Sequence, residues 1–207
     1  MKWLDFDRLY VFAKDILEEK YQLLQKWAEE KAEERMKEIL KWKKSKEKAG
    51  DEPVPFTFLF SENLKDVPLV SDFDDDYKTT RTLVIFDDMI TVRDQQVIEE
   101  YFVRGRKRNI SAIYLSQSFF HIPKLIRQNL SCAILFEIPD RRNLKEIATR
   151  VGSKFSKDET AEKYREAMES PCSSSDRPFL FIDDAQPKKV LAIRRCFDGL
   201  WMWKSAH

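Results

Sequence analysis

The chain has 207 residues, a length that suits one domain with a real buried core. Its content of 43% hydrophobic and 13% aromatic residues excludes an intrinsically disordered protein. Lys and Arg together number 37 against 36 Asp and Glu, so the net charge of +1 gives no global attraction to nucleic acid. Any surface that binds nucleic acid must therefore be local.

The cysteines and the apolar segments limit the setting of the protein. Cys132, Cys172 and Cys196 are odd in number, widely spaced and without a CxxC pattern, and only 2 histidines accompany them. This composition does not favour a structural zinc site and fits a reducing intracellular setting. Acidic residues interrupt the N-terminus where a signal peptide needs an apolar run, and no apolar stretch approaches the roughly 18 residues of a membrane span. The sequence therefore predicts a soluble intracellular protein without membrane contact.

The N-terminal third of the chain predicts two strands around a long helix. Residues 8–13 (RLYVFA) form the first strand, because aromatic and β-branched residues dominate there. From about Leu17 to Lys48, apolar residues recur every three or four positions among Glu and Lys, which predicts an amphipathic helix. Its mixed-charge face is interpreted as solvated, and its basic end either opposes the helix dipole or contacts nucleic acid. The second strand is expected at residues 56–60 (FTFLF).

The remaining chain alternates between apolar runs and helical segments. Three runs lack alternation, which is the pattern of parallel strands buried on both faces: 82–86, 110–115 and 132–136. Helices are expected at about 93–104, 123–128, 141–150 and 157–168. The last two strands, at 179–182 and 190–194, read as a hairpin. The pattern predicts one α/β domain over residues 1–207, with a mainly parallel sheet flanked by helices and a C-terminal β-hairpin.

Candidate chemistry lies where two neighbouring strands end. Ligands of open parallel sheets bind beyond the carboxyl ends of the strands, and the run TLVIF ends there in Asp87-Asp88. A hydrophobic strand followed by two acids is the Walker B pattern of ATPases. In that pattern Asp87 would hold Mg²⁺ through water, and Asp88 would orient or polarise the attacking water. Gln117, after the strand at 110–115, is interpreted as a sensor that holds this water or the γ-phosphate.

A second acidic pair in the chain follows a similar apolar run. Asp183-Asp184 ends the run FLFI, but Ala-Gln-Pro and another strand come next, which indicates a hairpin. Asp87-Asp88 is instead followed by a helix and a strand with a polar tip, as a strand-to-helix crossover requires. The context therefore favours Asp87-Asp88 as the catalytic pair.

The basic segment Arg104-Gly-Arg-Lys-Arg108 ends the helix that follows this pair. In one reading Gly105 takes the left-handed position after a helix, and the cations complement the helix dipole. In the other reading, Arg104 or Arg106 is an arginine finger that reaches the ATP site of a neighbouring subunit. The residues alone leave both readings open.

The phosphate-binding loop of a P-loop ATPase is missing from this sequence. The loop has the pattern GxxxxGK[ST], and none of the 4 glycines is followed by Lys-Ser or Lys-Thr. In this fold class the loop follows the first strand, and this chain starts at what looks like the second. The expectation is an incomplete domain that lacks the first strand, the phosphate loop and the first helix, and that is inactive alone.

Several blocks of the chain resemble the poxvirus-type DNA-packaging ATPases of the FtsK/HerA group, which occur in large DNA viruses and Maverick/Polinton elements. The resemblance covers most of the chain and is carried by these blocks: residues 7–15, 20–24, 82–89, 100–111 (EYFVRGRKRNIS), 114–119 (YLSQSF), 126–129 and 179–183. It implies a RecA-like P-loop core, with Asp87 and Asp88 as Walker B, Gln117 as the sensor and Arg104 or Arg106 as the finger. Asp88 stands where many P-loop ATPases have Glu.

The resemblance also implies a function and its partners. ATP and Mg²⁺ would power a ring, expected to be a hexamer, that moves double-stranded DNA into capsids in contact with capsid or portal components. A virus factory, the host cytoplasm or the nucleus would be its location. The alternative is a non-catalytic remnant or interaction protein from an integrated viral element.

Overall fold

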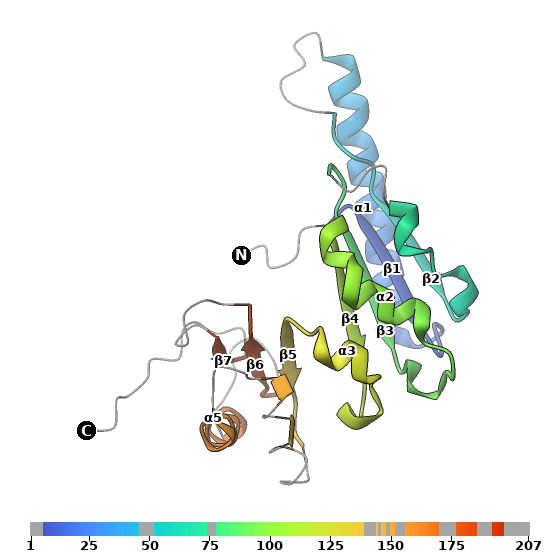
Figure 1. Ribbon diagram of the computed structural model, residues 1–207. Coiled ribbons are helices and arrows are strands. Elements are labelled where there is room, and N and C mark those ends of the chain that lie inside the picture. Colours follow the sequence, from blue (N-terminus) through green and yellow to red (C-terminus); the bar gives the residue numbers. More distant parts are fainter. Residues whose placement is uncertain are drawn as a thin grey trace. The chain divides into compact units, whose positions relative to one another are not determined.

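The computed structural model describes residues 6–45, 52–73, 78–138, 144, 146–147, 150–151, 156–169, 177–185 and 192–196. The chain divides into two compact units, residues 1–125 and residues 126–207. Each unit has its own sheet, coloured blue to green in the first unit and yellow to red in the second (Figure 1).

The first unit is built on a parallel sheet of four strands in the order β2-β1-β3-β4. Strand β1 lies inside the sheet, between β2 and β3. The register pairs Ala13 with Asp87 and Asp87 with Leu115, so the carboxyl ends of β1, β3 and β4 are level at one edge. The strands are β1 (Arg8–Ala13), β2 (Thr57–Ser61), β3 (Thr82–Asp87) and β4 (Ile110–Leu115).

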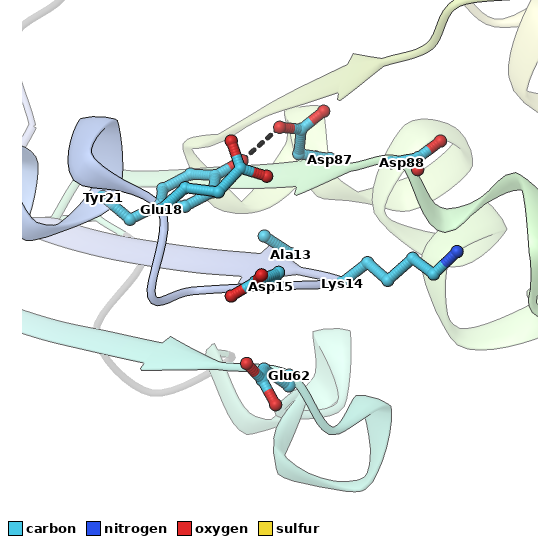
Figure 2. A pocket seen from close by; sticks show the side chains of 8 residues that line it. All are labelled: Ala13, Lys14, Asp15, Glu18, Tyr21, Glu62, Asp87 and Asp88. Carbon is cyan, nitrogen blue, oxygen red and sulfur yellow. Dashed lines mark hydrogen bonds between the residues drawn. The ribbon is translucent and has the colours of Figure 1, made fainter.

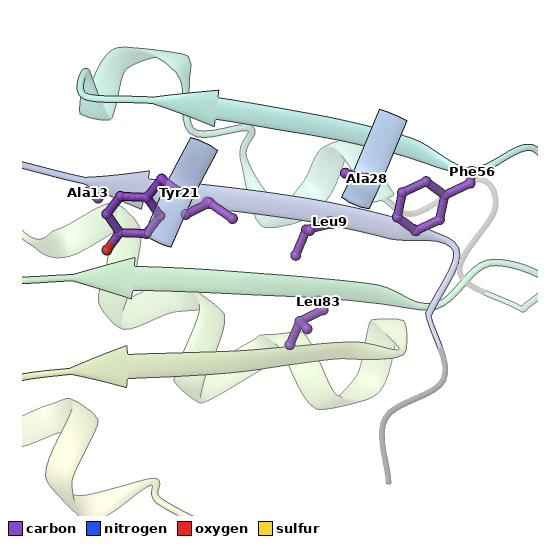
Figure 3. Close-up of a cluster of buried hydrophobic side chains, with 7 residues drawn as sticks. Leu9, Ala13, Tyr21, Ala28, Phe56 and Leu83 are labelled. Carbon is purple, nitrogen blue, oxygen red and sulfur yellow. The ribbon is translucent and has the colours of Figure 1, made fainter. Parts of the chain in front are cut away.

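Helix α1 (Glu19–Lys44) packs against one face of this sheet, and Figure 3 shows part of the contact. Side chains of a strand alternate between the two faces, and Leu9, Val11 and Ala13 of β1 all point toward α1. They form a buried cluster with Tyr21 and Ala28 of the helix. The three- and four-residue spacing of apolar side chains in the sequence therefore predicts the buried face of α1 correctly at Tyr21 and Ala28.

Helix α2 (Gln96–Arg104) covers the opposite face, so the unit has three layers (Figure 1). The packing on this side is aromatic. Phe12 of β1 and Phe86 of β3 stack with ring centroids 5.7 Å apart, and Tyr101 of α2 meets Phe86 edge-on at 5.5 Å. Such edge-on and offset pairs add to the free energy gained by burying apolar area. Because successive side chains of β1 and β3 pack toward α1 and α2 in turn, both strands are apolar over most of their length.

Short 3₁₀ turns connect these elements, and one of them corrects a sequence prediction. Gly105 has φ −60° and continues the helical path, whereas Asn109 has φ 51° and ends it in the left-handed conformation. Gly105 instead permits close packing, because a Cβ there would lie 3.3 Å from Ile110 Cβ. The turns are η1 (Leu64–Asp66), η2 (Val70–Phe73), η3 (Met89–Thr91), η4 (Gly105–Arg108) and η5 (Phe119–His121).

The second unit contains an antiparallel sheet in the order β5-β6-β7. The prediction that residues 132–136 form a parallel strand buried on both faces is wrong. Strand β5 runs antiparallel to β6, and Cys132 and Ile134 are exposed. A short apolar run cannot reveal its partner strand, which explains the error. The elements are α3 (Lys124–Gln128), which crosses the division at 125/126, and β5 (Cys132–Leu135), α5 (Lys157–Glu169), β6 (Leu180–Asp183) and β7 (Ile193–Arg195).

The fold class predicted from the sequence is confirmed: a mainly parallel sheet flanked by helices, and a C-terminal hairpin formed by β6 and β7. The predicted helix at 141–150 lies largely outside the described residues, as do Cys172 and the last predicted residues of the long helix, 46–48. Cys196 is buried and disulfide-bonded, which the spacing of the cysteines did not predict. Within the described ranges, no helix is long and apolar enough to cross a membrane.

Candidate functional site

A cavity of about 510 Å³ lies at the carboxyl edge of the parallel sheet. It is formed where β1, β2 and β3 end and where α1 begins, as Figure 2 shows. Five carboxylates and one lysine contribute to its wall, so we call it the acidic cavity. Its lining residues are Ala13, Lys14, Asp15, Glu18, Tyr21, Glu62, Asp87 and Asp88.

Two of these carboxylates hold the loop between β1 and α1 in place. The Asp15 Oδ1 atom accepts a hydrogen bond from the backbone N–H of Leu17 at 2.9 Å. The Glu62 Oε1 atom, just beyond β2, accepts one from the N–H of Ile16 at 3.2 Å. Backbone donors near a helix start lack partners within the helix, and these side chains satisfy two donors just before it. Asp15 and Glu62 thus shape one wall of the acidic cavity.

Asp87 is bound by two residues at the start of α1. Its Oδ2 atom accepts a hydrogen bond from the Tyr21 hydroxyl, drawn as a dashed line in Figure 2. The same oxygen is 3.0 Å from Lys20 Nζ, and Lys20 also lies 3.0 Å from Glu18 Oε2. The Asp87 side chain is only 16% exposed, whereas that of Lys20 is 55% exposed. The Asp87 carboxylate therefore binds the hydroxyl of Tyr21 and the ammonium group of Lys20.

The protonation states of these partners follow from their surroundings. Hydrogen bonds to Glu18 and then to Asp87 raise the pKa of Lys20, so it stays a cation at neutral pH. Burial, and next the hydrogen bond to Asp87, raise the pKa of Tyr21, so its hydroxyl stays neutral. Both residues can therefore donate hydrogen bonds to the carboxylate of Asp87.

Asp88 differs from Asp87 in both backbone and environment. Its backbone is left-handed, with φ 53° and ψ 34°, and its N–H donates to the carbonyl oxygen of Leu115 at 3.2 Å. Among the residues that the structure describes, the Asp88 carboxylate has neither a hydrogen bond nor an ion pair, and it lines the acidic cavity. Both oxygens of this carboxylate can therefore accept hydrogen bonds from water molecules in the cavity.

Gln117 lies at the same edge of the sheet but outside this cavity. It is exposed, two residues beyond Leu115, the register partner of Asp87. Gln117 lies in a tight turn that the Ser116 hydroxyl stabilises. This hydroxyl donates to the Ser118 carbonyl at 2.9 Å and accepts from the Ser118 N–H at 3.1 Å. Gln117 therefore lies near the carboxyl ends of β3 and β4 but does not contact Asp87 or Asp88.

The two candidate finger residues lie at the opposite, amino edge of the sheet. Arg106 lines a second cavity of about 250 Å³, together with Arg81, Asn109 and Ser111 at the starts of β3 and β4. Arg104 is 51% exposed and lies 3.8 Å from Glu100 on the same helix. A strand of this length separates the two edges by about 20 Å. Neither arginine can therefore serve the acidic cavity of its own chain.

The donors in the acidic cavity can be compared with the needs of Mg²⁺. No group of three or more Asp, Glu, His or Cys residues within the described ranges is arranged to hold a metal ion. Mg²⁺ in phosphoryl-transfer sites is commonly held by one or two carboxylates together with phosphate oxygens and water. Asp87 and Asp88 supply that number of carboxylates, so the residues suit a magnesium–triphosphate rather than a bare ion. Lys20 would have to move off Asp87 to admit it.

Sequence reasoning missed Lys20 as a partner of Asp87 and assigned Tyr21 only to the buried stripe of the helix. Tyr21 is indeed buried, but its hydroxyl reaches across to β3. Lys20 and Asp87 are 67 positions apart in the chain. Only the placement of β1 next to β3 brings them together, and strand order is not encoded in any local pattern.

The first unit is a parallel sheet with helices on both faces and an acidic pair at the carboxyl end of an inner strand, the place where ligands of such sheets bind. The family described as "Poxvirus A32 protein" matches residues 55–186, more than half of the chain. The chain belongs to this family. The match includes β2 to β6 and both candidate arginines.

Solved structures of viral packaging proteins are similar in fold. The genome packaging NTPase B204 from Sulfolobus turreted icosahedral virus 2, in complex with ATP-gammaS, is 13% identical with a TM-score of 0.45, over 92% of this chain and 96% of that chain. Its complex with AMPPCP gives 13% identity and a TM-score of 0.46, over 93% and 97%. The DNA-packaging ATPase B204 from Sulfolobus Turreted Icosahedral Virus gives 13% and 0.44, over 93% and 98%. No curated protein sequence matches the chain.

Proposed function

We propose that this chain supplies the water-activating half of an ATP site in a viral DNA-packaging motor. The observation that carries the proposal is the pairing of two carboxylates in one cavity at the end of a buried strand: Asp87, which is held by Tyr21 and Lys20, and Asp88, which has no partner among the described residues. Membership of the Poxvirus A32 family and similarity to proteins described as genome packaging NTPases support the choice of reaction. The products of the reaction would be ADP and phosphate.

The two acids are proposed to divide the work as their environments differ. Asp87 would hold Mg²⁺ through water, and Lys20, which now lies on its carboxylate, would have to move away from it. A bound Mg²⁺ would neutralise charge on the triphosphate. Asp88 orients the attacking water and draws on its proton, for which a carboxylate without other partners is suited. Gln117 would contact the water or the γ-phosphate once the nucleotide fills the edge of the sheet.

The phosphate loop must come from residues other than these, because the 207 residues contain no GxxxxGK[ST] sequence. Arg104 or Arg106 is proposed to act on the site of a neighbouring subunit, and the distance of both from the acidic cavity of their own chain agrees with action in trans. A ring of subunits, taken to be a hexamer, with double-stranded DNA in its channel and capsid or portal components at its face, completes the proposal.

The test compares two acidic pairs that both follow an apolar strand. Asp88→Asn keeps the shape of the side chain but removes its charge, so we expect ATP turnover to fall by about 100-fold or more. Affinity for Mg·ATP should stay within about threefold, since Asp88 is not proposed to bind the ground state. Turnover is measured with the full chain assembled with subunits that carry the phosphate loop.

Asp184→Asn is the matched control, because Asp184 follows β6 in the hairpin sheet and not β3. It should leave both turnover and affinity at the level of the unmodified chain. Wild-type turnover in Asp88→Asn would refute the role of Asp88. Assembly without any turnover from this chain's own site would favour the alternative, a non-catalytic subunit or remnant.

A further inference from the structure

A closed set of hydrogen bonds surrounds the turn that follows β3. Gln95 is buried, 9% exposed, and precedes α2. Its side-chain Nε2 donates to the carbonyl oxygens of Met89 at 2.8 Å and Val92 at 3.2 Å. Its Oε1 atom accepts from the Tyr114 hydroxyl at 2.9 Å. The amide thus uses both of its hydrogens and its oxygen inside the protein.

The orientation of this amide is dictated by its neighbours. The backbone carbonyls of Met89 and Val92 can only accept hydrogen bonds, so the NH₂ group must face them. The oxygen of Gln95 then faces Tyr114, whose hydroxyl must donate. Burial, and to a lesser degree the charge of Asp88, raise the pKa of Tyr114 to about 12, which keeps that hydroxyl protonated at neutral pH. The network can therefore be satisfied in one arrangement only.

The network is connected to the backbone of Asp88 at two points. Met89, which Gln95 holds, is the next residue in the chain. Leu115, whose carbonyl accepts the Asp88 N–H, is the next residue after Tyr114. Asp88 itself has φ 53°, in the left-handed region that is uncommon for residues with a Cβ, although Asp adopts it more often than most. Hydrogen bonds to Leu115 of β4 and to Gln95, just before α2, thus hold the backbone on both sides of this conformation.

We propose that Gln95 and Tyr114 are positioning residues for Asp88, which fix the turn after β3 so that the Asp88 carboxylate faces the acidic cavity. The role in turnover rests on the proposed function, whereas the hold on the turn does not. Tyr114 and Leu115 at the end of β4 bond to Gln95 and to the Asp88 backbone, so a shift of β4 would also change the direction of the Asp88 side chain. The two residues touch no substrate and act through Asp88 alone.

Amide hydrogen exchange in the full chain tests the hold on the turn. Tyr114→Phe removes one hydroxyl, and the Asp88 and Val92 amides should then exchange about tenfold faster or more. Gln95→Met, which fills the same space without hydrogen bonds, should have at least the same effect and covers the case in which Tyr114→Phe does not fold. Amides of β1 keep their protection in a folded variant. Unchanged exchange at Asp88 and Val92 in the folded variants would overturn the proposal.

Tyr101→Phe is the matched control, because it too removes a hydrogen-bonded tyrosine hydroxyl from the α2 side of the sheet. That hydroxyl donates to the Pro68 carbonyl at 2.6 Å, away from the turn. Exchange at Asp88 and Val92 should match that of the unmodified chain. Faster exchange there, equal to that in Tyr114→Phe, would mean a general loss of stability and would also overturn the proposal.

Turnover of the assembled protein tests the consequence for catalysis. Tyr114→Phe should lower kcat about tenfold or more and leave KM for Mg·ATP within about twofold, because only the direction of Asp88 changes. Tyr101→Phe should leave both unchanged. Full kcat in Tyr114→Phe, while Asp88→Asn is inactive, would refute the positioning role. If Asp88→Asn itself is fully active, the proposed function fails, and hydrogen exchange still decides whether the turn is held.

Discussion

At the scale of single residues, backbone handedness marks the two ends of the parallel strands. Asp88 follows β3 and Asn109 precedes β4, and both adopt left-handed conformations with φ 53° and 51°. The Asn109 carbonyl accepts a hydrogen bond from Thr82 N–H at 3.0 Å, which joins the starts of β3 and β4. The left-handed backbone of Asn109 ends η4 and leads the chain directly into β4.

A pair of substitutions at Asn109 should isolate the cost of this conformation. Asn109→Ala and Asn109→Gly both lose the Asn side chain, but only alanine has a Cβ that clashes in the left-handed region. We expect the alanine variant to be less stable than the glycine variant by about 1 kcal/mol, measured by urea unfolding. At Ser111, an exposed position inside β4, the order should reverse. Equal stability of the two Asn109 variants would contradict the backbone argument.

At the scale of elements, α1 contacts the sheet through a narrow stripe of buried side chains. Over 26 residues it would be about 39 Å long, roughly twice the length of the strands beneath it. Ala28 is 0% exposed and lies in the cluster with Leu9 and Phe56, where its small side chain allows the helix to approach β1. Tyr21, one end of this stripe, also bonds to Asp87. The fit of α1 on the sheet therefore determines the position of the site.

Enlarging Ala28 should disturb that fit. Ala28→Leu forces three additional carbon atoms into a filled contact, and we expect a loss of about 1–3 kcal/mol in the free energy of unfolding. Glu30→Leu places the same side chain on the exposed face of α1 and should change stability by about 0.5 kcal/mol or less. Chemical denaturation of both variants is the measurement. A neutral Ala28→Leu would show that the helix is not seated closely on β1.

At the scale of the whole molecule, the sequence predicts elements better than it predicts their neighbours. The bounds of β1 and β4 match the predicted runs. The prediction that residues 110–115 are buried on both faces is wrong, because β4 is an edge strand in which Ser111 and Leu115 are exposed. The prediction of Asp87 and Asp88 as the catalytic pair rests on the apolar run before them, which forms β3. The bond between Tyr21 and Asp87 and the antiparallel pairing of β5 depend on strand order, which long-range packing decides. The left-handed Asn109 was missed because glycine is the commoner signal.

Buried tyrosines in both units should make the stability of the molecule sensitive to alkaline pH. Burial raises the pKa of Tyr21, Tyr101, Tyr114 and Tyr164 above the ordinary value of 10.0, for Tyr114 to about 12. In the unfolded chain these groups ionise near pH 10, while the folded chain still holds them neutral. Their contribution to stability is therefore complete below pH 10 and is lost as the pH rises toward 12.

Urea midpoints at pH 8, 9.5 and 11 should accordingly stay level between the first two and fall at the third. The raised pKa of Lys20 acts in the same direction, because its ion pairs with Glu18 and Asp87 also disappear on deprotonation. In the double variant Tyr101→Phe with Tyr114→Phe the midpoint should fall less steeply from pH 9.5 to 11, although the variant is less stable at pH 8. Parallel curves for the two proteins would mean that these hydroxyls ionise as easily in the folded chain as in water, and that the burial of the aromatic layer between the sheet and α2 is not tight enough to keep them neutral.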